Sequence, residues 1–127
     1  MLVVAKRDTF IGCPKKIKDA GYLESSQTLI TVGTQYEVFA LALFAGVPML
    51  QIINDLGYPV WLPSWLFQVT DMLLPSDFLC NLLESELEMI IGPDFVSRDE
   101  DSYRRMVELD PTSVDAFWKR VNDRRFE

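Results

Sequence analysis

Histidine, the side chain most often used in nucleophilic and acid–base catalysis, is the first type of residue to look for in this chain. The sequence has no histidine, which excludes Ser-His-Asp triads, Cys-His dyads and the commonest zinc ligands. Its two cysteines, Cys13 and Cys80, have no imidazole to activate them, and we expect both to be buried, reduced thiols. A single disulfide between them stays an alternative, because the sequence does not give their distance.

The sequence also lacks the motifs of phosphate-binding loops and calcium-binding loops, and its lysines are badly placed for a catalytic dyad. There is no GxxxxGK or GxGxxG run to hold phosphates, and residues 99–101, Asp-Glu-Asp, lack the glycine and distal glutamate of a calcium loop. The five lysines lie within residues 6–18 or at position 119, which disfavours a Ser-Lys dyad. Two-carboxylate glycosidase chemistry stays open, although no acidic pair is marked by its spacing. We expect no catalytic residue, no cofactor and no metal.

The distribution of charge is the strongest functional signal. The chain carries 19 acidic and 12 basic residues, and residues 19–97 contain ten carboxylates with no lysine or arginine. Carboxylates at the surface of this segment should project a negative potential over about 8 Å at physiological salt. This favours a basic protein partner and disfavours direct nucleic-acid binding, since phosphates need a basic surface. The simpler alternative is that acidity only keeps the protein soluble.

An aromatic segment provides the second signal. Residues 58–67 combine aromatic side chains with prolines: Tyr58, Pro59, Trp61, Pro63, Trp65 and Phe67. Prolines remove backbone donors, so the segment should form an edge or a corner. Its tryptophans can fill the core, meet a partner's arginine or stack on a sugar ring. The candidate partner-binding residues are Asp55, Trp61, Trp65, Asp71, Glu84 and Glu88.

The elements that must position these residues change in character near residue 75. Before it, short β-branched or aromatic runs between turn signals predict strands at Leu2–Lys6, Thr28–Val32, Tyr36–Phe44, Met49–Asn54, Val60–Leu62 and Leu66–Thr70. The Asn54–Gly57 turn predicts a hairpin. Ala40–Leu43 favours a helix by propensity, but such a helix would be apolar on nearly every side, so we predict a strand buried on both faces.

After residue 75 the spacing is helical. Ser97 with Glu100 matches a capping box and predicts a helix over about 97–108. Asp110 as a cap and Pro111 at the first helical position predict a second helix over about 111–124.

The segment before these helices is ambiguous. As a single helix, residues 76–91 would place four apolar side chains on one face: Leu79, Leu83, Leu87 and Ile90. Glu86 would fall near the middle of that face, and a lone buried carboxylate is costly. We therefore predict that the helix ends near Glu84 and that Leu87–Ile91 is extended, with a buried functional Glu86 as the alternative.

These elements predict a single α+β domain over residues 1–127. A small, strongly bent antiparallel sheet or partial SH3-like barrel, over about residues 1–74, would be packed by the two C-terminal helices. The longest apolar run, Val38–Leu50, is thirteen residues long and too short to cross a membrane as a helix. Lys6 and Arg7 cut off the apolar N-terminus before it could form a signal segment. We expect a soluble, cytoplasmic protein without a membrane partner, and leave its oligomeric state open.

Three segments, Gly33–Val38, Asp55–Pro63 and Leu66-Phe67, together resemble the core of small SH3-like barrels, where a strand pair, a tight Asp/Gly turn and an aromatic-proline corner recur. In size, acidity and lack of catalytic groups the chain is also similar to bacterial immunity proteins that neutralise toxin domains. The resemblance implies a non-enzymatic inhibitor of a basic toxin or nucleic-acid enzyme, and no family motif is carried over residue by residue.

Two other function classes remain as alternatives. One is a small-ligand or glycan-binding domain that uses Trp61 and Trp65. The other is a structural subunit of a larger assembly.

Overall fold

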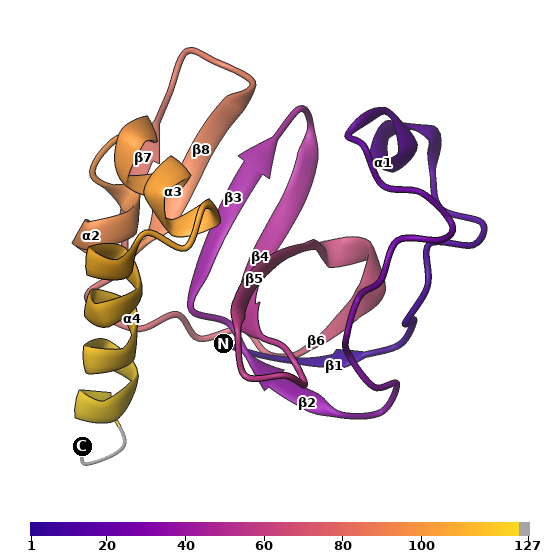
Figure 1. The fold of residues 1–127 in the computed structure, drawn as a ribbon, viewed down its shortest axis with the longest axis horizontal. Coiled ribbons are helices and arrows are strands. Elements are labelled where there is room, and N and C mark those ends of the chain that lie inside the picture. The colour runs from indigo at the N-terminus through magenta and orange to yellow at the C-terminus, as the bar shows by residue number, and fades with distance from the viewer. Residues whose placement is uncertain (125–127) are drawn as a thin grey trace.

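The computed structural model describes residues 1–124 and contains two antiparallel sheets (Figure 1). The three-stranded sheet has the order β2 (Gln35–Glu37), β1 (Leu2–Ala5) and β6 (Phe67–Asp71). The five-stranded sheet has the order β5 (Pro59–Pro63), β4 (Val47–Ile53), β3 (Ala40–Phe44), β8 (Leu87–Gly92) and β7 (Leu79–Leu82). The helices are α1 (Lys15–Asp19), the 3-10 helix η1 (Ser64–Leu66), α2 (Asp94–Ser97), α3 (Glu100–Val107) and α4 (Pro111–Arg124). The chain is therefore an α+β protein.

The chain crosses from one sheet to the other inside the predicted strand Tyr36–Phe44. The segment is extended and not helical, but it is divided into β2 and β3 at two buried residues, Val38 and Phe39. The Val38 N–H donates to the carbonyl of Met1 at 3.0 Å, whereas the Phe39 N–H donates to the carbonyl of Gln51 at 2.8 Å. These two residues thus join the sheets, and their side chains are buried in different places: Val38 lies in the main core, whereas Phe39 packs against Phe117 of α4.

The predicted strand Thr28–Val32 is wrong. Leu29 has a φ of +54°, a left-handed conformation that a continuous strand does not contain. The segment is held by individual bonds instead: the Thr28 hydroxyl donates to the carbonyl of Asp8 at 2.7 Å, and the Asp55 N–H donates to the carbonyl of Leu29 at 2.8 Å.

The predicted helix between residue 76 and Glu84 is also wrong, because β7 pairs there with β8. The extended conformation predicted for Leu87–Ile91 is confirmed. The five-stranded sheet therefore continues to Gly92, well past the predicted limit at residue 74. Glu86 lies exposed in the turn between the two strands, so the alternative of a buried Glu86 is wrong.

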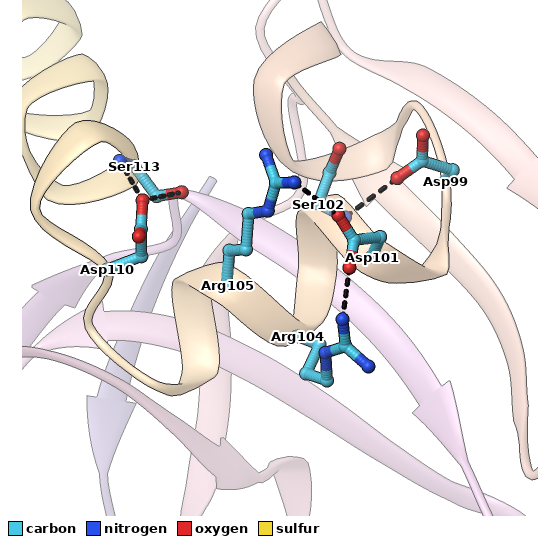
Figure 2. A network of polar contacts seen from close by, with 7 residues as sticks. All are labelled: Asp99, Asp101, Ser102, Arg104, Arg105, Asp110 and Ser113. Carbon is cyan, nitrogen blue, oxygen red and sulfur yellow. Dashed lines mark hydrogen bonds and ion pairs between the residues drawn. The ribbon is translucent and has the colours of Figure 1, made fainter.

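Each of the two longer C-terminal helices, α3 and α4, begins at an aspartate whose carboxylate accepts a backbone N–H of the first turn. α4 matches the predicted range 111–124, and the Asp110 carboxylate accepts the Ser113 N–H at 3.2 Å (Figure 2). The predicted Ser97 cap is wrong: Asp99 caps α3 by accepting the Ser102 N–H at 2.7 Å. Ser97 ends α2, and its buried hydroxyl donates to the carbonyl of Gly92 at 3.1 Å.

Two hydrophobic clusters form the core: the larger one includes Val3, Ile52 and Leu66, and a second one joins the helices to the five-stranded sheet. The buried members of the second cluster are Phe39, Ala40, Val96, Met106, Phe117 and Val121. Helix α2 approaches the sheet closely because Gly92 has no side chain: an added Cβ would lie 2.9 Å from Cγ1 of Val96 in α2. Within the described residues, no helix has the length and apolarity needed to cross a membrane.

Candidate functional site

The six candidate residues do not form one continuous surface. Glu84 and Glu88 lie on the β7–β8 hairpin, at the end of the five-stranded sheet where Phe44 pairs with Leu87. Asp55 lies in the β4–β5 turn, at the opposite end of the same sheet. The seven residues of β4 separate these ends by about 20 Å at the usual rise of an extended chain. A single partner contact therefore does not connect all three carboxylates without spanning the sheet.

Asp55 is engaged within the fold. One of its carboxylate oxygens accepts the Tyr36 hydroxyl at 2.6 Å, and the other accepts the Thr31 hydroxyl at 2.7 Å. These hydrogen bonds, that from Tyr36 first, lower the pKa of Asp55. The carboxylate fastens the irregular segment after residue 28 to the β4–β5 turn, which gives it a structural role.

Asp71 belongs to the other sheet, where it ends β6. Its carboxylate accepts the Leu73 N–H at 2.9 Å and so shapes the turn that leaves the strand. Of the four acidic candidates, only Glu84 and Glu88 lie on the same hairpin.

The ring of Trp65 already makes a cation–π contact with an arginine of the same chain, Arg7. The Arg7 guanidinium lies 4.2 Å from the centre of the indole ring and donates to the Trp65 carbonyl at 2.6 Å. The cation–π contact expected from a partner is thus made by a residue 58 positions away in the sequence.

Trp61 is half-buried on β5, where the two hydrophobic clusters meet. Its ring centre lies 4.9 Å from that of Tyr103 on α3. The buried indole N–H has no acceptor among the described residues. This unpaired donor distinguishes Trp61 from a tryptophan that only fills the core.

The arginines of the C-terminal helices are largely engaged with nearby acids. Figure 2 shows Arg104 and Arg105 both directed to the carboxylate of Asp101. Arg98 pairs with Asp94, and Arg120 contacts Asp77 at 2.8 Å through its Nη2. Among the described residues, none of these arginines forms an ion pair with the exposed carboxylates of Glu84, Glu86 and Glu88, which we call the acidic hairpin.

The sequence did not point to β7 as an exposed edge. Leu79 is 52% exposed and Leu82 75%, although both are large apolar residues. In the described chain β7 pairs only with β8, and Figure 1 shows their turn at the top of the molecule. The leucines of β7 are also spaced as in a helix, so the sequence predicted a helix here. The neighbouring residues Met72, Leu73 and Leu74 form another run of exposed apolar side chains.

The cysteines differ in their surroundings. Cys13 is buried as expected, whereas Cys80 is exposed, a correction that follows from its place on the edge strand β7. Both are free thiols. No group of three potential metal ligands comes together in the part of the chain that the structure covers.

Comparison of the chain with protein-family models, with curated proteins and with solved structures finds no match.

Proposed function

We propose that this chain is a non-enzymatic protein-interaction domain that binds a basic partner along the free edge of β7, beside the acidic hairpin. The observation that carries the proposal is the combination of an unpaired strand edge, exposed leucines and unpaired carboxylates on one hairpin. The partner would contribute an extended segment with lysine or arginine side chains.

The edge of β7 differs from the opposite edge of the same sheet. There, β5 carries Pro59 and Pro63, which cannot donate to an added strand. Between Leu79 and Leu82 there is no proline and no charge, the features that usually protect an edge. An extended partner segment can pair with such an edge through its backbone.

The acidic hairpin supplies charge complementarity. Glu84, Glu86 and Glu88 lie within five consecutive positions, and the cations nearest in sequence are occupied by other acids. Three exposed carboxylates attract a basic segment and accelerate its encounter, an effect that salt screens over about 8 Å. Toxins and nucleic-acid enzymes form the proposed partner class, because a surface that binds phosphates is rich in lysine and arginine.

The test is affinity capture of partners at low salt, followed by affinity measurement on the identified protein. We expect the double variant Glu84→Lys/Glu88→Lys to lose the partner, with affinity reduced at least tenfold, about 1.4 kcal/mol. Glu24→Lys, which changes an exposed carboxylate on a different loop, is the matched control and should bind normally.

A second arm tests the strand edge itself. Leu82→Lys places a charge on an exposed position of β7 and should abolish binding without unfolding the protein. Binding that is insensitive to salt, or that is equal in all three variants, would contradict the proposal.

A further inference from the structure

The two faces of the five-stranded sheet are covered unequally near β7. Along most of β3 and β8, buried and half-buried residues alternate, so the two sets point to opposite faces. The buried set faces the helices, because an added Cβ on Gly92 would lie 2.9 Å from Cγ1 of Val96 in α2. The half-buried set on the other face is entirely apolar: Leu41, Leu43, Met89 and Ile91.

Strand register places two exposed residues of β7 on that same face. Residues directly opposite each other in antiparallel strands point their side chains to the same side. Ile91 lies opposite both Leu41 and Cys80, and Met89 lies opposite both Leu43 and Leu82. Cys80 is exposed, and Leu82 is 75% exposed. We call these six residues the open face: Leu41, Leu43, Cys80, Leu82, Met89 and Ile91.

The composition of the open face points to a partner. A sheet face that meets water usually carries polar side chains, whereas none of these six residues is polar enough to bind water strongly. A contiguous apolar surface of this kind marks an interaction site. It ends at the free edge of β7, so a strand added there would continue it.

The backbone of β7 shows which of its residues an added strand would meet. The Leu83 N–H donates to the carbonyl of Glu88 in the β7–β8 hairpin at 2.9 Å. Because the backbone groups of a strand point alternately to its two sides, those of Cys80 and Leu82 are directed to the free edge. A strand that bonds to them places two of its own side chains, two positions apart, on the open face.

Charge distinguishes the two ends of this edge. The acidic hairpin begins at Glu84, directly beyond the Leu82 end of β7. At the other end, the carboxylate of Asp77 already accepts Nη2 of Arg120 at 2.8 Å. Basic residues of a partner are therefore attracted to the Leu82 end. In an antiparallel strand, the commoner arrangement, the residues at that end come first in the sequence.

We infer that the partner strand runs antiparallel to β7, with basic residues first and then apolar residues at alternate positions that extend the open face. This inference rests on the proposed function and adds to it the order of side chains in the partner.

The probe is the synthetic peptide RKRTVTVT with blocked ends, which would place its basic residues beside the acidic hairpin and its valines beside Leu82 and Cys80. Two control peptides carry the same charge: RKRTSTST lacks the apolar side chains, and TVTVTRKR has the reverse order. Calorimetry at low salt, with a reducing agent present, should show one-to-one binding of RKRTVTVT. Its affinity should be about tenfold higher than that of RKRTSTST and about fivefold higher than that of TVTVTRKR.

Two variants of β7 test the open face with the same peptides. Leu82→Thr keeps a β-branched strand residue but removes the apolar contact, and should weaken RKRTVTVT about fivefold while changing RKRTSTST less than about twofold. Leu79→Thr is the matched control, because Leu79 is 52% exposed on the other face of β7. It should change the affinity for either peptide by less than about twofold.

Amide hydrogen exchange tests the backbone register. Saturating RKRTVTVT should slow exchange at the N–H groups of Cys80 and Leu82 by about tenfold or more. Exchange at Asn81 and Leu83, whose N–H groups point to β8, should change much less.

The inference is overturned by equal affinity for RKRTVTVT and RKRTSTST, by tighter binding of TVTVTRKR, or by no binding of any of the three peptides. Failure of the proposed function has a different signature. It would appear as unchanged binding of RKRTVTVT to Glu84→Lys/Glu88→Lys, together with unchanged exchange at Cys80 and Leu82, and this result would overturn the inference as well.

Discussion

At the scale of single residues, the side chains of Tyr22 and Tyr103 have strongly raised pKa values. Burial raises the pKa of both phenols to about 12, and the nearby Tyr22 adds to the effect on Tyr103. Burial disfavours the charged phenolate, so each hydroxyl stays neutral throughout the physiological range.

The raised pKa values predict a loss of stability in alkali. Because the unfolded phenols ionise near pH 10, the neutral form stabilises the fold fully below that pH, and the contribution is lost between about pH 10 and 12. Ultraviolet titration should show Tyr22 and Tyr103 ionising late together with Tyr36, whose pKa is also raised by burial and by its hydrogen bond to Asp55, and urea denaturation should show a falling midpoint. Tyr103→Phe should reduce this fall; an unchanged alkaline profile in that variant would contradict the assignment.

At the scale of elements, the β3–β4 turn contains a strained residue. Ala45 and Gly46 have φ angles of +48° and +76°, the combination of a two-residue hairpin turn. Glycine adopts this conformation freely, whereas alanine does not. The Ala45 N–H also donates to the carbonyl of Glu86 at 2.7 Å, which holds the turn against the acidic hairpin.

Replacing Ala45 should therefore change stability in a direction set by backbone preference. Ala45→Asn should raise the free energy of unfolding by about 0.5–1 kcal/mol, because asparagine tolerates a positive φ. Ala45→Val should lower it by about 1 kcal/mol or more, since β-branched residues resist that conformation. Urea denaturation measures both changes, and equal stability of the two variants would show that the turn is not strained.

Local signals explain which elements the sequence predicted. Asp110 and Pro111 are adjacent residues that together mark the start of α4. The Asn54–Gly57 turn likewise joins two strands that are neighbours in the sequence and in the sheet. β7 lacked such a signal, because its leucine spacing also fits a helix and its pairing partner lies on the far side of a turn. The positions of the site residues were equally hard to predict. Asp55 and Glu84 lie at opposite ends of the five-stranded sheet because of how its strands pair, and strand pairing is not visible in the local sequence.

At the scale of the whole molecule, Phe117 docks the C-terminal helices on the point where the chain changes sheets. It is 1% exposed, and its ring centre lies 5.1 Å from that of Phe39. Phe39 in turn directly precedes β3, so the contact links α4 to the centre of the five-stranded sheet.

Removing this ring should weaken the entire assembly. Phe117→Ala should lower the free energy of unfolding by about 3–5 kcal/mol, through lost burial and the cavity left behind. Asp115→Ala on the exposed side of α4 is the control and should change it by less than about 0.5 kcal/mol. Calorimetry or denaturant titration compares the two, and a loss below about 1 kcal/mol in Phe117→Ala would mean that α4 is not docked through this ring.

The order of the three-stranded sheet has a consequence for folding during synthesis. β1 is synthesised before both of its neighbours, yet it is the central strand, and its second neighbour, β6, begins only at residue 67. Until that residue has emerged, one side of β1 has no native strand to pair with, and its apolar residues Val3 and Ala5 await their final packing. The nascent chain is therefore exposed to wrong pairings while the residues between β1 and β6 are synthesised, which is the period when a chaperone would protect it most.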